Sequence, residues 1–214
     1  MAKNFVSNKD ESARLFKSDF LEFFTHVHPV LPLLVYVPVV SYFLYQAILD
    51  PEIGTYAILS LFVGGLFFWT FAEYILHRFV FHYEPTSGWG KKLHFLMHGI
   101  HHDYPQDSKR LVMPPAVSLP LAALFYGLFT VTMGVTATGP FFAGFIVGYL
   151  GYDMIHYATH HFAMKSPVGL WLKKHHMRHH YQTDDLYYGV SNPLWDYVFG
   201  TMKQEKEEPT EAMQ

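Results

Sequence analysis

Four apolar stretches constrain the fold of this chain more than any other feature of its sequence. Each is close to the ~20 residues that a helix needs to cross the hydrocarbon core of a bilayer. They cover about Val30–Ile48, Thr55–Leu76, Ala116–Val135 and Pro140–Ala158. Residues 50–54 alone separate the first two stretches, and residues 136–139 alone separate the last two. The sequence therefore predicts an all-α membrane protein with four transmembrane helices, arranged as two hairpins.

Local signals support these helices. Pro114 and Pro115 precede the third stretch and suit a helix start. Gly144 and Gly148 have the small-xxx-small spacing that lets membrane helices approach closely. Residues 12–24 mix aromatic and charged side chains, which favours a short helix lying at the membrane surface, with a loose soluble tail as the alternative.

The basic residues predict an orientation. All 15 Lys and Arg residues lie before the first stretch, between the second and third, or after the fourth, which is one side of a four-span bundle. Cytoplasmic loops carry the excess of Lys and Arg. We therefore expect both termini and every histidine cluster to be cytoplasmic. A soluble helical protein with an apolar core is the alternative, and it does not explain this segregation of charge.

Composition limits the remaining choices. With 214 residues the chain suits one domain, which we place at residues 29–201, between an N-terminal cytoplasmic or interfacial segment (1–28) and a charged, disordered tail (202–214). The net charge of -3 gives no basic field, so we expect no nucleic-acid partner. The absence of cysteine excludes disulfides, thiolate zinc sites and iron–sulfur clusters on this chain. Imidazole and carboxylate remain as metal ligands.

Histidines are the outstanding excess, with 15 in the chain. His98, His101 and His102 have the i, i+3, i+4 spacing that places side chains on one helical face. The spacing recurs at residues 176–180, and two pairs adjoin the apolar stretches. Ten candidate ligands result: His77, His82, His98, His101, His102, His156, His160, His176, His179 and His180. Imidazole suits iron, zinc, copper and nickel, so we expect a two-metal site with about five nitrogens for each ion.

Three further details belong to this prediction. The interval of five from His77 to His82 does not align on an ideal α-helix, so a bulge or helix end is needed there. One helical triplet can supply both metals. The other five histidines are left outside the metal sphere, as interfacial or outer groups: His26, His28, His94, His161 and His175.

Two carboxylates lie inside apolar stretches, where an ionisable group is a functional candidate. Glu73 is four residues before His77, and Asp153 is three before His156. Each could accept the free N–H of a ligating imidazole, or else form a helix–helix hydrogen bond. Tyr152 is a candidate to line the reaction cavity.

The histidine motifs resemble the boxes of the fatty acid hydroxylase/sterol desaturase superfamily over about residues 60–201. They are His-Arg-Phe-Val-Phe-His at 77–82, His-Gly-Ile-His-His at 98–102, Gly-Tyr-Asp-Met-Ile-His-Tyr-Ala-Thr-His-His at 151–161, and Lys-Lys-His-His-Met-Arg-His-His at 173–180. Residues 107–115 and the segments 188–191 and 195–201 are most similar to those of the fatty acid 2-hydroxylases, which act on sphingolipid acyl chains.

The resemblance implies the ten histidines as ligands of two metal ions and places Tyr152 and Asp153 near the acyl pocket. It implies iron for catalysis, with zinc as the alternative bound ion, and dioxygen as co-substrate. Several eukaryotic members carry a fused b-type cytochrome domain. Only about thirty residues precede the first apolar stretch, so we expect a separate electron donor: a b-type cytochrome, a ferredoxin or a reductase. The expected substrate is a membrane lipid or fatty acyl chain.

Other functions stay open at this stage. A sterol or carotenoid hydroxylase or desaturase would use the same motifs. A membrane metal transporter or store would place its ligands along a path through the membrane. A zinc hydrolase is disfavoured, because the chain has no His-Glu-x-x-His motif and hydrolytic zinc normally needs three protein ligands.

Overall fold

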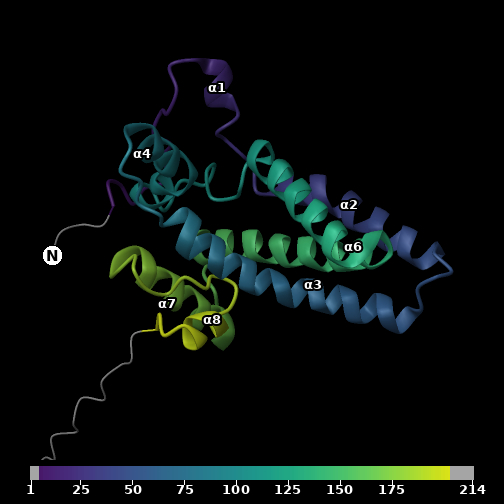
Figure 1. Cartoon of the computed structure of the whole chain (residues 1–214). Coiled ribbons are helices and arrows are strands. Elements are labelled where there is room, and N and C mark those ends of the chain that lie inside the picture. Colours follow the sequence, from purple (N-terminus) through teal and green to yellow (C-terminus); the bar gives the residue numbers. More distant parts are fainter. Residues whose placement is uncertain (1–4, 203–214) are drawn as a thin grey trace, which may run out of the picture.

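The computed structural model describes residues 5–202, whose regular secondary structure is all helix, without a β-strand (Figure 1). The elements are α1 (Asp19–Phe23), α2 (Val30–Leu49), α3 (Thr55–Leu76), the π-helix η1 (His77–Phe81), α4 (Gly88–His94), the π-helix η2 (Phe95–Gly99), α5 (Ile100–Asp103), α6 (Pro115–His161), α7 (Pro167–Tyr181) and α8 (Leu194–Val198). The predicted all-α class is therefore confirmed.

Three helices are long and apolar enough to cross a membrane: α2, α3 with its continuation η1, and α6. Helix α2 matches the first predicted stretch to within one residue, and α3 matches the second. Helix α6 begins at Pro115, as the two prolines predicted. It contains both remaining apolar stretches, and residues 136–139, expected to be a connecting loop, are helical.

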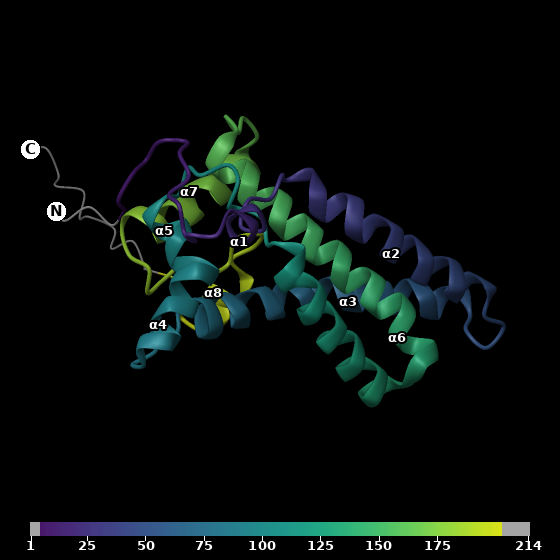
Figure 2. The ribbon, with the colours of Figure 1, turned by 90° about the horizontal axis from the view of Figure 1, so that it is seen from above.

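The break within α6 lies at Gly134 and divides the helix into arms of residues 115–134 and 135–161. Gly134 has φ 79° and ψ 166°, a conformation that glycine reaches without the steric cost of a Cβ atom. The Thr138 hydroxyl donates to the Gly134 carbonyl at 2.7 Å, one turn back along the helix. Figure 2 shows the two arms diverging from this bend. One residue is enough to turn the chain, so no loop is required.

The second arm of α6 packs between α2 and α3 (Figure 2). Glycines allow this close approach: a Cβ atom on Gly144 would lie 1.9 Å from the carbonyl oxygen of Phe62, and one on Gly148 would lie 2.5 Å from the Cβ of Trp69. The predicted role of the two glycines is confirmed. Aromatic side chains fill the core around them, including Tyr36, Trp69 and Tyr149.

The short helices gather at one end of this bundle, opposite the α2–α3 connection (Figure 1). The N-terminal segment crosses this end before α2 begins. Its helix is shorter than predicted, because only Asp19–Phe23 of residues 12–24 are helical. Phe20 and Phe23 remain 71% and 72% exposed, so the segment still presents apolar rings outward. The predicted disordered tail lies outside the described residues except for Met202.

Candidate metal centre

A π-helix brings together the two histidines whose spacing is irregular. Helix α3 passes directly into η1, and the amide of His82 donates to the carbonyl of His77 at 3.1 Å, a bond that spans five residues. The wider turn places residues i and i+5 on one side. The expected local irregularity is confirmed, and it aims both imidazoles at the same point, 5.0 Å apart between ring centroids.

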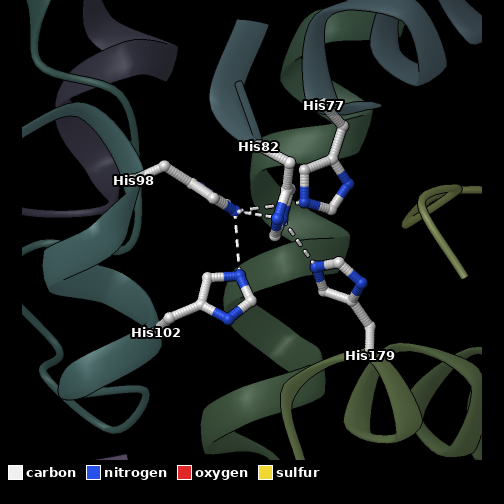
Figure 3. A group of neighbouring side chains, drawn as sticks. All are labelled: His77, His82, His98, His102 and His179. Carbon is white, nitrogen blue, oxygen red and sulfur yellow. Dashed lines mark hydrogen bonds between the residues drawn. The ribbon is translucent and has the colours of Figure 1, made fainter. Parts of the chain in front are cut away.

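Five imidazoles converge in what we call the first histidine group: His77, His82, His98, His102 and His179 (Figure 3). Their Nε2 atoms lie close together. The Nε2 atom of His98 is 3.2 Å from that of His77, 3.1 Å from that of His82 and 3.0 Å from that of His102. The Nε2 atom of His179 lies 2.9 Å from that of His82. Four separate elements supply this one cluster.

Five more imidazoles form the second histidine group: His101, His156, His160, His176 and His180. The Nε2 atoms of His101 and His156 are 2.9 Å apart. The Nε2 atom of His176 lies 2.9 Å from that of His160 and 3.1 Å from that of His180. All five side chains are buried. They come from α5, the end of α6 and α7.

Helices α5 and α7 serve both groups. On the 98–102 segment, His98 and His102 join the first group and His101 joins the second. On α7, His179 joins the first group, whereas His176 and His180 join the second. The interval of four keeps two side chains above each other, and the residue between them points to the neighbouring group. One triplet thus feeds both groups, as the sequence predicted.

The donor atoms fit two metal ions. Two imidazole nitrogens at about 2.1 Å from one ion and about 90° apart would be roughly 3 Å from each other, close to the observed Nε2 separations. In each group the candidate donor atoms all lie within 4.8 Å of one another. Within residues 5–202 neither group includes a carboxylate, so each offers only nitrogen ligands, which suit iron, zinc, copper or nickel.

Burial keeps these imidazoles neutral. It lowers the pKa of His102 to about 4, and it lowers the pKa values of His98 and His176 well below their usual range, with neighbouring imidazoles adding to the shift. The pKa values of His101, His179 and His180 are depressed for the same reason. A metal ligand must be deprotonated. The site therefore presents its nitrogens in the form that an ion requires.

Both candidate carboxylates are buried. The contacts with ligating histidines that the sequence suggested for them are not found among the described residues. Glu73 accepts hydrogen bonds from the amides of Val190 and Ser191 at 2.7 and 2.8 Å and from the Ser191 hydroxyl, so its oxygens face a loop rather than an imidazole. The Oδ2 atom of Asp153 has no hydrogen-bond partner among the described residues, and neither has Nδ1 of His156. Asp153 instead contributes to the wall of a cavity.

This cavity has a volume of about 300 Å³ and lies against both histidine groups. His98 of the first group and His101 and His156 of the second are in its wall. Tyr152 and Asp153 line it beside these histidines. The rest is mainly apolar and comes from the N-terminal segment, the α4–η2 region and residues 111–117. An apolar pocket with a few convergent polar groups is typical of a ligand site.

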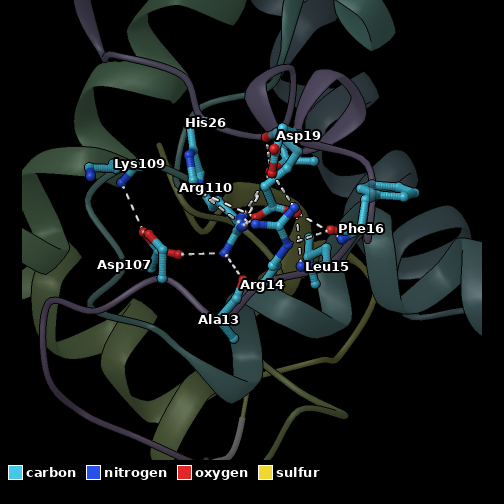
Figure 4. A network of polar contacts seen from close by, with 12 residues as sticks. Ala13, Arg14, Leu15, Phe16, Asp19, His26, Asp107, Lys109 and Arg110 are labelled. Carbon is cyan, nitrogen blue, oxygen red and sulfur yellow. Dashed lines mark hydrogen bonds and ion pairs between the residues drawn. The ribbon is translucent and has the colours of Figure 1, made fainter.

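Sequence reasoning missed the cover of this cavity. Leu15, Phe16 and Thr25 line it from the N-terminal segment, and Arg110, which contacts this segment, lines it as well. The Arg110 guanidinium donates to the carbonyl of Ala13 and to a carboxylate oxygen of Asp107, at 2.6 and 3.1 Å (Figure 4). Residues 107–115 were singled out by similarity alone; no spacing rule indicated that Arg110 would bind a segment so far away in sequence.

The five histidines left outside the metal sphere lie outside both groups. The Nε2 atom of His175 is 3.1 Å from a carboxylate oxygen of Asp196, and that of His26 is 2.9 Å from the Arg110 guanidinium.

The sequence model of the family described as fatty acid hydroxylase matches residues 62–201. This chain belongs to the fatty acid hydroxylase family. The matched range coincides with the one over which the histidine boxes and their flanks are similar, so the predicted family is confirmed. The predicted class of enzyme, an oxidoreductase, is confirmed as well. Because it has apolar helices of membrane-spanning length, the chain is a membrane protein of this family.

Relatives in the family are similar over most of the chain. Dihydroceramide fatty acyl 2-hydroxylase FAH1 of Arabidopsis thaliana is 39% identical over 92% of this chain and 82% of its own length. Fatty acid 2-hydroxylase of Mus musculus is 37% identical over 92% of this chain and 58% of its own. A solved structure of full-length scs7p, in which only the hydroxylase domain is visible, matches with a TM-score of 0.82 at 38% identity, covering 87% of this chain and 70% of that one.

Proposed function

We propose that this chain is a membrane-bound, dioxygen-dependent fatty acid 2-hydroxylase, in which each histidine group holds one metal ion. One observation carries this proposal: a single apolar cavity has imidazoles of both groups in its wall. A lipid chain in that cavity would lie beside both ions. The named 2-hydroxylase relatives support the choice of reaction.

Iron is the metal that we expect in the working enzyme, because zinc does not change redox state. The bound ions would supply the dioxygen chemistry that amino-acid side chains cannot perform. Overall, a C–H bond beside the acyl carbonyl becomes C–OH, and dioxygen, two electrons and two protons are consumed with release of one water. We propose that a redox protein supplies the electrons, for which a b-type cytochrome, a ferredoxin or a reductase are the candidate classes.

The protein's own contribution is to bind and orient the substrate and to exclude water. Apolar side chains such as Leu96 and Val117 contact the acyl chain. The unpartnered Oδ2 atom of Asp153 is buried at the same wall as His156, and a buried acceptor without a partner is costly. An N–H or O–H group of the substrate head would satisfy it. We therefore propose that the head binds at Asp153 and Tyr152, with the adjacent carbon toward the histidines.

The substrate enters from the lipid phase in this proposal. Exposed aromatic side chains surround the histidine end of the bundle, among them Phe20, Phe23, Phe79 and Trp89. Such side chains anchor proteins at the membrane interface. The two arms of α6 would serve as two spans, giving four with α2 and α3. Because Lys and Arg gather at this same end, we place the histidine groups and both termini in the cytoplasm.

The test is lipid mass spectrometry of cells that express the chain, under ¹⁸O₂. We expect 2-hydroxy acyl lipids carrying one ¹⁸O atom in the wild type and none in His101→Ala. His28→Ala is the matched control and retains product, because His28 is exposed and outside both groups. Hydroxylated or desaturated sterols without 2-hydroxy acyl lipids would favour the sterol enzyme instead. Metal analysis of the purified protein should give two ions per chain.

A further inference from the structure

A loop at residues 186–191 touches two imidazoles of the first group from behind. The Nδ1–H of His179 donates to the carbonyl of Leu186 at 2.7 Å, and that of His77 donates to the carbonyl of Tyr188 at 2.5 Å. A carbonyl oxygen only accepts, so both imidazoles carry their hydrogen on Nδ1. Their Nε2 lone pairs are therefore free and directed at the group's centre.

Two buried carboxylates hold this loop by hydrogen bonds. Glu73 of α3 accepts the amides of Val190 and Ser191 together with the Ser191 hydroxyl. Asp196 of α8 accepts the amides of Tyr188 and Gly189, at 2.9 and 2.8 Å. Neither carboxylate touches a histidine of either group.

Asp196 has further partners that anchor it. The Thr201 hydroxyl donates to it at 2.6 Å, and His175 of α7 lies 3.1 Å from its other oxygen. Asp196 is completely buried. The loop is thus connected to α3 through one carboxylate and to α7 through the other.

The conformation of the loop is imposed by these contacts. Tyr187, between the two accepting residues, has φ 64°, which is strained for a residue other than glycine. A Cβ atom on Gly189 would lie 2.0 Å from the carbonyl oxygen of Asn192. Strain of this kind persists only where surrounding contacts over-determine it.

The second group has no equivalent support. The Nδ1 atoms of His156, His160, His176 and His180 are buried, and within residues 5–202 no protein atom accepts a hydrogen bond from them. A hydrogen bond from the distal nitrogen orients a ligating imidazole and raises its basicity. The two groups therefore differ in the hydrogen bonds that their Nδ1 atoms donate, which orient a histidine ligand and raise its basicity.

We propose that Glu73 and Asp196 are positioning residues that act through residues 186–191 on His77 and His179, and that they make the first group the tighter of the two metal sites. This inference rests on the proposed metal binding at the histidine groups. Residues 186–191 would therefore affect the ion in the first group and not the ion in the second.

The test measures Zn²⁺ affinity site by site, by chelator competition on the purified full chain in nanodiscs. The His156→Ala/His160→Ala double variant leaves only the first group intact, and the His82→Ala/His102→Ala double variant leaves only the second. We expect the first of these to bind Zn²⁺ more tightly. Adding Asp196→Asn or Glu73→Gln should weaken the first group by about 10- to 100-fold and change the second by less than about threefold.

Asp107→Asn is the matched control. Asp107 is 2% exposed, like the two positioning carboxylates, but it binds Arg110 and no imidazole. It should leave both affinities unchanged. Equal weakening of both groups by Asp196→Asn would mean a general structural role and would overturn the inference, as would no weakening of either.

A second measurement needs no removal of ligands. The wild-type chain carrying two Zn²⁺ should release them to a chelator in two phases, and Asp196→Asn should convert the slow phase to a fast one. A single phase in the wild type would overturn the inequality of the sites. A wild type that binds no Zn²⁺ at all would instead contradict the metal centre itself, so the two failures are distinguishable.

Discussion

The carboxylate of Glu22 accepts a hydrogen bond from the guanidinium of Arg110 at 2.6 Å, joining the N-terminal segment to the wall of the cavity. Glu22 also accepts the amides of Leu15 and Phe16, at 2.9 and 2.8 Å. The same carboxylate therefore shapes the segment and fastens it. Since Leu15 and Phe16 line the cavity, this contact decides whether the cavity is covered.

Replacing Arg110 should release the N-terminal segment. Arg110→Met leaves the carboxylates of Glu22 and Asp107 buried without a cation, and breaking a buried pair in this way costs about 3–5 kcal/mol. Hydrogen exchange of the amides at residues 13–26 should rise steeply. Arg14→Met is the control: Arg14 pairs with Asp19, but their side chains are 55% and 93% exposed, so exchange should not change. Equal effects of the two variants would contradict the assignment.

Acid should loosen the same segment. Burial raises the pKa of Glu22, but hydrogen bonds from the Phe16 and Leu15 amides and the charge of Arg110 outweigh it, so the net pKa is lowered. A carboxyl whose pKa is depressed on folding contributes stability that is complete above its ordinary value of 4.5 and is lost as pH falls through the lower folded value. Proteolysis within residues 13–26 should therefore accelerate below about pH 4.5. In Glu22→Gln the segment should be cleaved quickly at all pH values, and a preserved acid transition there would assign the titration to another group.

One methyl group added at the contact between α3 and α6 should lower the unfolding free energy. In Gly144→Ala the new Cβ meets the backbone carbonyl of Phe62, and a backbone atom cannot rotate away as a side chain can. We expect a loss of about 1–3 kcal/mol in unfolding free energy, measured in detergent. Gly151→Ala on the same helix has no atom within 4 Å of the added Cβ and should be neutral or slightly stabilising. A neutral Gly144→Ala would show that the helices separate easily.

The sequence predicted this fold well where hydrophobic length and local spacing decide it. The ends of α3 and the π-helical turn from His77 to His82 follow from the apolar stretch and from an interval that an α-helix cannot satisfy. The division of His101 and His102 between two groups follows from helical geometry. None of these features needs information about distant parts of the chain.

Contacts between distant residues could not be predicted in this way. Glu73 is a functional candidate from the sequence because a carboxylate in an apolar stretch needs a partner, but its partners lie at residues 190–191, which no helical spacing relates to it. The sequence predicts the change of direction at residues 136–139, as a loop, whereas the chain bends at Gly134. One glycine is enough for this bend, and no loop forms. No sequence pattern indicates the role of Arg110, because this role depends on where the N-terminal segment folds back.

Asp153 offers the sharpest separation of substrate binding from metal binding. Its Oδ2 atom has no hydrogen-bond partner within residues 5–202, it lines the cavity beside His156, and it belongs to neither histidine group. Asp153→Asn keeps the size of the side chain but replaces one of its oxygen atoms by an amide group that only donates. A buried donor of the substrate head left without an acceptor costs about 1–3 kcal/mol, which corresponds to roughly 5- to 150-fold in turnover over KM.

Both ions should remain in this variant, so metal analysis and product formation are measured on the same preparation. Asp153→Ala should lose as much activity or more, because it also opens space in the cavity wall. If Asp153→Asn lost an ion, Asp153 would have to support the second histidine group, and the observed geometry would be altered on metal binding. If it kept both ions and full turnover, the substrate head would have to bind at another polar group of the cavity, such as Tyr152, Arg110 or Thr25.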